Sequence, residues 1–380
     1  MTKLKWRRTW FQVHKWIGLI LAILIVPLCV SGAALVYDHA LDRALNPQRF
    51  ATSGTTTLPP ERYLAAAAAR AAPGERVAQL SFGDEGGPVI VALAPARSGP
   101  ARGGPPARTN VYLDPPSANI LDVASSTSGV LRFLHVLHGS LQIPGGWGRS
   151  IVGWIGVAMM LSAFTGLWLW WPTVGSLKRA FRWGRHPNLD TNIHQTFGFW
   201  IALPLFVLSL TGAWISFPAF FNGLSGAVQP RGPDRGAQMR ARPVAAPRLS
   251  AAVAIERARA MAPGTVRQLT WPTEKKPDWT VQVKPERGAP VTVSVADDGG
   301  VAAIAPAMAP AGQSRLMRQI HEGSIGGPLW KLIVFLGGAI PTALAVTGVI
   351  MWWRARGWKA RLAEKRKHLG KAKRASAGGA

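Results

Sequence analysis

Cysteine is almost missing from this sequence. Cys29 is the only one among 380 residues, and it lies inside an apolar run. One thiol cannot build a disulfide framework or a cysteine-rich metal site. The C-x-x-C-H pattern of covalent haem attachment is also absent from the sequence. Any haem in this protein would therefore be held non-covalently.

Acidic residues are scarce as well. The chain has 18 Asp and Glu against 44 Lys and Arg, which gives a formal net charge of +26. In a soluble protein this balance favours nucleic-acid binding. Here much of the positive charge flanks long apolar segments, so attraction to anionic lipid explains it. We expect a lipid bilayer and no nucleic acid among the partners.

Several motifs of enzyme chemistry are also lacking. The sequence has no G-x-G-x-x-G that opens a helix after a strand, no Walker A loop and no H-E-x-x-H, because His321-Glu322 is not followed by a second histidine. These absences remove support for nucleotide-binding, ATPase and zinc-protease activities. With no flavin or nicotinamide module, any electrons must come from another molecule.

Charge is missing altogether from four segments: 17–36, 151–171, 197–221 and 332–353 contain no Asp, Glu, Lys or Arg. Each has roughly the 20 residues that a helix needs to cross about 30 Å of hydrocarbon. Together with 48% hydrophobic residues and 17 Trp, they predict a mainly α membrane protein with four transmembrane helices. The first segment resembles a signal peptide, but its apolar run exceeds the usual h-region of roughly 7–15 residues.

Basic residues near the ends of these segments predict the orientation. The N-terminus, the tail after Trp353 and the short link with Lys178, Arg179, Arg182 and Arg185 are all basic. We therefore expect both chain ends in the cytoplasm and the two long connections outside. Long connections translocate largely regardless of their charge, so their own Arg residues do not oppose this orientation.

The two long connections share a pattern of secondary structure. In the first, a helix is expected over 58–72 and strands over 77–82, 89–94 and 110–113, with a flexible loop over 97–108. In the second, a linker over 223–248 precedes a helix over 249–261 and strands over 266–271, 279–284 and 291–295. Alternating apolar residues between Gly- and Pro-rich turns favour strands.

The membrane segments also repeat. His14 lies eighteen residues before Gly32, and His194 lies eighteen residues before Gly212. Arg132 precedes His138 by six residues, as Arg315 precedes His321. A hydroxyl residue stands directly before each of four glycines, in Ser31-Gly32, Thr165-Gly166, Thr211-Gly212 and Thr347-Gly348. We therefore predict a duplicated unit of helix, small α+β domain and helix.

The repeated histidines indicate a cofactor. On this topology His14 and His194 lie at the cytoplasmic ends of their helices, and His138 and His321 lie at the outer ends. Two imidazoles related by a duplication can supply both axial ligands of one haem iron. The glycines would leave room for a flat macrocycle, although close helix packing through small residues explains each glycine equally well.

Other polar residues near the outer pair have two interpretations each. Arg132 and Arg315 could hold haem propionates or contact lipid headgroups. His135, with Arg318 at the equivalent position of the second half, could contact a ligand histidine or a propionate. We expect His39 to be interfacial, His186 and His368 to be solvated, and the Trp170-Trp171 and Trp352-Trp353 pairs to form an aromatic belt.

The pattern His14-x-Trp16-x-Gly18 with Ser31-Gly32, His194-x-x-x-Gly198 with Thr211-Gly212, His138-Gly139-Ser140 and His321-Glu322-Gly323-Ser324 resembles the PepSY-associated transmembrane family. Members similar to this chain include iron-regulated inner-membrane proteins and di-haem ferric-siderophore reductases. The resemblance implies two non-covalent haem b groups, a cytoplasmic-side one on His14 and His194 and a periplasmic-side one on His138 and His321.

This resemblance gives the predicted regions their names. They are the cytoplasmic N-terminus and first membrane helix (1–38), a periplasmic PepSY-like domain (39–131), the second helix with its lead-in (132–172), a cytoplasmic loop (173–190), the third helix (191–222), a linker with a second PepSY-like domain (223–314), the fourth helix with its lead-in (315–354) and a basic cytoplasmic tail (355–380).

The function implied is that of a haem-dependent oxidoreductase in a bacterial inner membrane. It would pass electrons from a cytoplasmic donor, such as a flavoprotein, to a periplasmic ferric siderophore. Two alternatives remain open: a membrane-anchored PepSY protein that binds peptides or regulates a protease without redox activity, and a transporter with helices broken at Pro27, Pro204 and Pro341. The basic tail would bind anionic lipid or dock an acidic donor.

Overall fold

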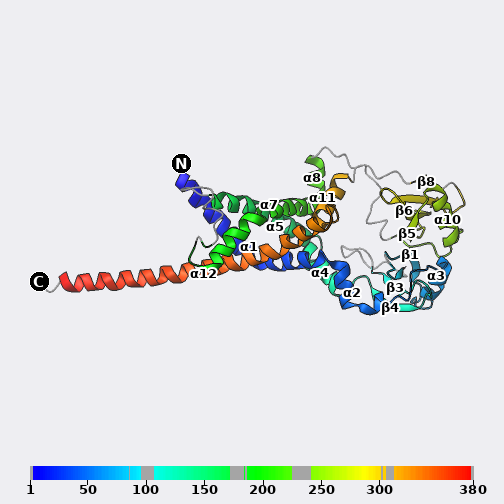
Figure 1. Cartoon of the computed structure of the whole chain (residues 1–380), viewed down its shortest axis with the longest axis horizontal. Helices are drawn as coiled ribbons and strands as arrows, with labels where there is room; N and C mark the ends of the chain where they lie inside the picture. Colours follow the sequence, from blue (N-terminus) through cyan, green and yellow to red (C-terminus); the bar gives the residue numbers. More distant parts are fainter. Residues whose placement is uncertain are drawn as a thin grey trace.

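The computed structural model describes residues 3–84, 86–95, 107–171, 184, 186–224, 241–300, 303–304 and 312–377. The molecule is elongated, with a helical bundle in the middle and a β-sheet at one end (Figure 1). Both chain ends lie on the other side of the bundle from the sheet, and the fourth long helix projects beyond the bundle toward the C-terminus (Figure 1). The bundle thus separates the sheet from the two chain ends.

Within the described residues, four helices are long and apolar enough to cross a membrane: α1 (Lys3–Leu35), α5 (Trp147–Trp170), α7 (Leu189–Ser216) and α12 (Gly327–Ala377). Helix α5 packs on α7, and α12 packs on α1 and α7. Many large apolar side chains point out of the bundle, such as Ile23 at 83% exposed and Leu203 at 72%. Hydrocarbon is the solvent that suits this surface, so the predicted membrane protein with four apolar helices is confirmed.

Two of these helices end at other residues than the predicted apolar segments. One stops before a proline, and the other continues through the basic residues of the tail. The predicted segment 197–221 was wrong at its end, because α7 stops at Ser216 and a short helix α8 (Pro218–Leu224) follows. Pro218 has no backbone N–H to continue the helix. Helix α12 instead runs far beyond its predicted apolar segment, since the basic tail continues it as a helix.

Shorter helices link the bundle to the sheet. Helix α2 (Asp38–Leu45) and the 3-10 helix η1 (Pro47–Phe50) follow α1, while α4 (Val130–Ser140) precedes α5 and α11 (Gly312–Glu322) precedes α12. Helix α4 ends at Leu141, which has the left-handed φ of 52°, and α11 ends before Gly323 with a φ of 77°. These breaks leave the last turns of α4 and α11, which carry His138 and His321, packed against α1 and α7.

In the described part of the chain, the sheet has eight antiparallel strands in the order β4-β3-β2-β1-β5-β6-β7-β8. Six of them lie within one residue of the predicted strands: β1 (Arg76–Ser81), β2 (Val89–Ala94), β3 (Thr109–Leu113), β5 (Thr265–Thr270), β6 (Asp278–Lys284) and β7 (Val291–Ala296). The edge strands β4 (Ile120–Ser125) and β8 (Ala303–Ile304) were not predicted, because their side chains are largely accessible and show no clear alternation.

The two long connections contribute four strands each to this one sheet. Strands β1 and β5 join them, with Leu80 opposite Leu269. Helices α3 (Pro60–Ala68) and α10 (Ala251–Met261) pack on one face and share a single hydrophobic core with the strands, at the end of the molecule farthest from the bundle (Figure 1). Pairing β1 with β5 removes two exposed strand edges, which explains why the halves form one layer.

Three expectations fall mostly or wholly outside the described residues. They concern the flexible loop over 97–108, the basic link that holds Lys178, Arg179, Arg182 and Arg185, and most of the linker over 223–248.

Candidate functional site

The first histidine pair lies at the end of the bundle nearer the chain termini. His14 of α1 and His194 of α7 face each other with ring centroids 6.3 Å apart and ring planes at 89°. The second pair lies at the end nearer the sheet, where His138 of α4 and His321 of α11 have ring centroids 6.0 Å apart and planes at 40°. We call these the inner and the outer pair.

Hydrogen bonds fix how three of these imidazoles are oriented. His14 Nδ1 lies 3.1 Å from the Ser162 carbonyl oxygen, His138 Nδ1 lies 2.8 Å from that of Leu28 and His321 Nδ1 lies 3.1 Å from that of Leu208. A carbonyl oxygen only accepts, so each Nδ1 must carry the proton. The Nε2 atom of each neutral ring then has a free lone pair.

The fourth imidazole, that of His194, is also held through its Nδ1, but by a threonine hydroxyl. His194 Nδ1 lies 3.1 Å from Thr347 Oγ1, and the backbone of Leu344 is a further hydrogen-bond partner of His194. Thr347 Oγ1 donates to the Ala343 carbonyl at 2.8 Å, so it is available to accept from the imidazole. All four rings are therefore anchored through one nitrogen.

Each histidine packs against one of the four hydroxyl-glycine dipeptides on a neighbouring helix. A Cβ added at Gly32 would stand 2.6 Å from His138 Cε1, and one at Gly166, Gly212 or Gly348 would stand 3.1, 3.1 or 3.6 Å from Cε1 of His14, His321 or His194. The sequence predicted that these glycines make room for a macrocycle. The structure shows that their nearest side chains are the imidazoles themselves.

The distance between the paired rings suits two ligands of one metal ion. A metal–imidazole bond is about 2 Å long, so two imidazoles on opposite sides of one ion have ring centroids roughly 6 Å apart. The observed 6.3 and 6.0 Å match this requirement. Among the residues that the structure describes, no three His, Cys, Asp or Glu gather as a metal site. The spacing of the rings in each pair would suit an ion that takes two protein ligands, such as the iron of a planar cofactor.

A cavity of about 760 Å³ lies at the outer pair and is lined by His138, His321, Gly32, Gly139 and Gly212, among others. Its size is within the roughly 300–1,000 Å³ of cofactor and ligand pockets. Burial lowers the pKa values of both His138 and His321, because a charged imidazole is poorly solvated there. Both rings are thus kept neutral, as metal ligation requires.

Of the three arginines predicted near the outer pair, only Arg318 is among the residues that line this cavity. Arg149, Arg318 and Lys331 line it, together with Asp38 and Glu322. Arg132 and Arg315 are not among the lining residues. Arg149 was missed because its sequence position at the start of α5 carries no repeat signal, and only the packing of α5 beside α7 brings it there.

The remaining histidines have diverse surroundings. His135 and His39 both line the outer cavity, and His135 Nδ1 lies 2.9 Å from the Leu131 carbonyl of its own helix. His186 Nε2 lies 3.1 Å from Gln195 Oε1, so it is not simply solvated as predicted. His368 is exposed on α12.

The predicted aromatic belt is only partly exposed. Trp171 and Trp353 point outward, whereas Trp170 is buried and stacks on Phe199 with ring centroids 4.0 Å apart. Trp170 therefore belongs to the interior of the bundle.

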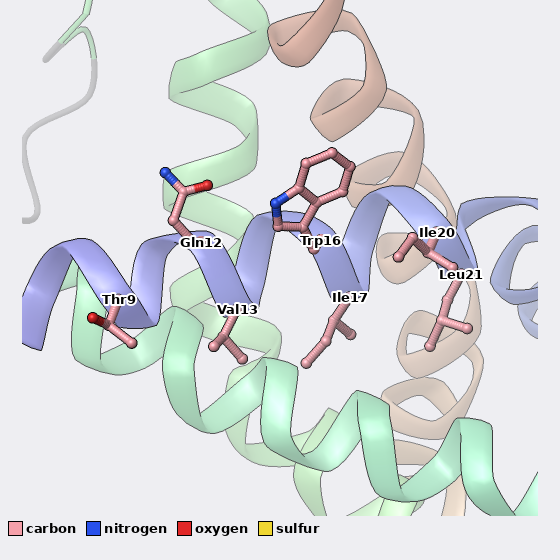
Figure 2. A pocket seen from close by; sticks show the side chains of 7 residues that line it. All are labelled: Thr9, Gln12, Val13, Trp16, Ile17, Ile20 and Leu21. Atoms are coloured by element: carbon pink, nitrogen blue, oxygen red, sulfur yellow. The ribbon is translucent and has the colours of Figure 1, made fainter.

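A shallow apolar groove of about 540 Å³ runs along α1 near the inner pair. Figure 2 shows Val13, Ile17 and Leu21 directed toward a neighbouring helix, while Gln12 and Trp16 point the other way. Trp16 and Ile20 of this groove are largely exposed. The groove is part of the apolar surface of the bundle, and His14 is not among its lining residues.

We compared the sequence with known proteins and with descriptions of protein families. No curated protein matches this sequence at a significant level. The description of one family, the PepSY-associated TM region, matches residues 11–355. That range contains α1 from Phe11 onward, the other three membrane helices up to the start of the basic tail, both histidine pairs and the whole sheet. The chain therefore belongs to the PepSY-associated TM region family.

Proposed function

We propose that this protein is a di-haem b-type membrane oxidoreductase that passes electrons from a cytoplasmic donor to a periplasmic acceptor, a ferric siderophore. The observation that carries the proposal is the two histidine pairs, with ring centroids 6.3 and 6.0 Å apart. Their anchored Nδ1 atoms leave an Nε2 lone pair free on each ring.

The chain's own residues would hold each cofactor from both sides. His14 and His194 would supply the inner ligands, and His138 and His321 the outer ones. Haem bound between two histidines supplies a one-electron ferric/ferrous couple. The carbonyl and hydroxyl acceptors keep each imidazole neutral and oriented, which is the usual task of groups behind a metal ligand.

The separation of the two sites supports transfer across a membrane. Helix α1 carries His14 of the inner pair and, eighteen residues later, Gly32, which contacts His138 of the outer pair. At 1.5 Å per residue these positions are about 27 Å apart along the helix. Hydrocarbon is about 30 Å thick, so one site would lie near each membrane surface.

The cations of the outer cavity would bind the carboxylates of the cofactor. Arg149, Arg318 and Lys331 line the cavity, and charge-assisted hydrogen bonds from such groups hold carboxylates well. Arg318 also pairs with Glu322 at 3.0 Å. We assign the propionates to these residues in place of Arg132 and Arg315.

The cellular arrangement is part of the proposal. The protein would lie in a bacterial inner membrane with both chain ends in the cytoplasm and the sheet in the periplasm. A duplication of the helix–α+β–helix unit would account for the two related histidine pairs and for the pairing of β1 with β5. Reduction of the ferric siderophore would release its iron, because ferrous iron binds oxygen chelators less tightly than ferric iron does.

Absorption spectroscopy of the purified full chain tests the proposal. Reduction by dithionite should give a Soret band and a sharp α band. His14→Ala and His194→Ala should each remove the same half of the haem, and His138→Ala and His321→Ala the other half. His368→Ala, at an exposed position on α12, is the matched control and should keep the full spectrum.

A colourless wild-type protein that was produced with ample haem would contradict the proposal. It would favour the alternative, a membrane-anchored protein that binds peptides through its sheet domain without redox activity.

A further inference from the structure

The hydrogen bonds behind the four histidines are unequal. Within the described residues, His14 Nδ1 has the Ser162 carbonyl and Thr165 Oγ1 at 3.1 Å each. His321 Nδ1 likewise has the Leu208 carbonyl and Thr211 Oγ1 at 3.1 Å. His194 has Thr347 Oγ1 at 3.1 Å and the Leu344 backbone. Three imidazoles thus have a backbone group and a threonine hydroxyl as partners.

His138 is the exception. Among the described residues, the hydrogen-bond partner of its Nδ1 is the Leu28 carbonyl alone, at 2.8 Å. The hydroxyl at the equivalent position is Ser31, whose Oγ donates to the Pro27 carbonyl at 2.7 Å and lies 3.0 Å from the Leu28 carbonyl. The inner pair therefore has two threonine acceptors and the outer pair has one.

The nearest charges also differ in sign. Asp190 is the charged side chain that interacts electrostatically with His194 of the inner pair. It also forms an ion pair with Arg354, at 2.6 Å. Arg318 is the one that acts on His321 of the outer pair. Arg149 and Lys331 also line the outer cavity, where with Arg318 they outnumber the two carboxylates, Asp38 and Glu322.

Both differences act on an iron couple in the same direction. When the oxygens behind an imidazole accept a stronger hydrogen bond from its Nδ1–H, the ring becomes a better electron donor to the iron. This favours the ferric state. Nearby negative charge favours the ferric state as well, whereas positive charge favours the ferrous state.

We propose that these residues give the inner site a lower reduction potential than the outer site, so that electrons rest preferentially on the outer site. This inference depends on the proposed di-haem function. Thr165 and Thr347 act as positioning residues that favour the ferric state at the inner site. Ser31 and Arg318 leave the outer site easier to reduce. The direction of electron flow toward the sheet side is thereby built into the helices.

Spectroelectrochemistry of the full haem-loaded chain tests the order of the two potentials. The His14→Ala variant isolates the outer haem, and His138→Ala isolates the inner one, so each wave can be assigned. At one ambient potential we expect the oxidised-to-reduced ratio of the inner site to exceed that of the outer site by on the order of tenfold, which is 59 mV for a one-electron couple. Equal potentials or the reverse order would overturn the proposal.

Single substitutions separate the contributions. Thr347→Val should raise the inner potential, and Thr347→Ser, which keeps the hydroxyl, should restore it. Ser31→Thr and Arg318→Gln should lower the outer potential. Arg315→Gln is the matched control, because Arg315 is exposed on the same helix and does not line the cavity. An unchanged potential in both Thr347→Val and Arg318→Gln would refute these roles.

The outcome also distinguishes the two proposals. A wild-type chain without haem absorption would remove the proposed function and this inference together. Two bound haems in the wrong order would remove only the inference. In the cofactor-free chain, ¹⁵N spectra should show the proton on Nδ1 of all four imidazoles, and protonated Nε2 would contradict the proposed orientation.

Discussion

At four places in this protein a glycine lets an imidazole approach the backbone of a neighbouring helix. The fit is tightest at Gly32, where an added Cβ would stand 2.6 Å from His138 Cε1 and 2.9 Å from its Nδ1. A Cβ added at Gly348 would be 3.6 Å from His194 Cε1, which is an ordinary van der Waals contact. The four positions share one motif, yet they tolerate a methyl group differently.

Gly32→Ala should therefore displace His138 and remove the proposed outer haem, leaving about half of the haem content that we expect of the wild-type chain. The reason is steric, because the added methyl group would overlap the imidazole, and a shift of the ring away from it would break the hydrogen bond from His138 Nδ1 to the Leu28 carbonyl. A pyridine haemochrome assay measures the change. Gly348→Ala is the control and should keep both haems; equal haem content in the two variants would contradict the argument.

One carboxylate in the sheet region sets a pH limit on stability. Asp114 is buried and accepts hydrogen bonds from the Ser53 backbone at 2.7 Å, the Ser53 hydroxyl at 2.6 Å and the Ser117 hydroxyl at 2.5 Å. Burial alone would raise the pKa of Asp114, but the hydrogen bonds from Ser117 and Ser53 outweigh it and lower that pKa.

Since the folded-state pKa is the lower one, Asp114 stabilises the fold above the ordinary Asp pKa of about 3.9, and this contribution is lost as the pH falls through the folded value. Asp114→Asn should cost about 1–3 kcal/mol at pH 7 and less at pH 3, because the contribution of the carboxylate begins to be lost below its ordinary pKa. Thermal unfolding followed by tryptophan fluorescence measures both. Asp298→Asn, in an exposed turn, should change stability by less than about 0.5 kcal/mol.

The helices of the bundle pack through small residues at a few points of contact. A Cβ added at Gly338 of α12 would meet the Cys29 carbonyl oxygen at 2.5 Å and Ala33 Cβ at 2.9 Å, both on α1. Because one of these atoms belongs to the backbone, a side-chain rotation cannot relieve the clash. Close approach through small residues is a common means of helix association in membranes.

Gly338→Ala should destabilise the bundle by about 1–3 kcal/mol, as overpacking of a close-packed contact does. Gly357→Ala lies on the same helix where nothing is within 4 Å, and alanine there should be neutral or stabilising by up to about 1 kcal/mol. Thermal unfolding in one detergent compares the two. A neutral Gly338→Ala would show that α1 and α12 do not need this contact.

The whole molecule places the sheet and the chain ends at opposite ends of the bundle (Figure 1). Because the native chain has one cysteine, which is buried, the proposed orientation can be measured by labelling. In a Cys29→Ser background, Thr57→Cys should react with a membrane-impermeant maleimide in spheroplasts. Ala355→Cys should react only after lysis, because it lies on α12 at the start of the basic tail, which we place in the cytoplasm. Labelling of Ala355→Cys before lysis would reverse the proposed orientation.

The sequence by itself determined the features that depend on neighbours along the chain. Uncharged runs predicted the four membrane helices, and alternating apolar residues placed six strands to within one residue, because helix and strand periodicity are local properties. The fixed interval from His14 to Gly32 and from His194 to Gly212 also predicted which histidines to compare. The short edge strands β4 and β8 lack a clear local pattern and were missed.

Only the tertiary structure decided which residues meet across elements. It placed His138 on Gly32 and His321 on Gly212, brought Arg149 and Lys331 to the outer cavity in place of Arg132 and Arg315, and joined the two halves through Leu80 and Leu269. The physical reason is that such contacts follow from how helix faces and strand edges pack, which periodicity along a single chain does not encode.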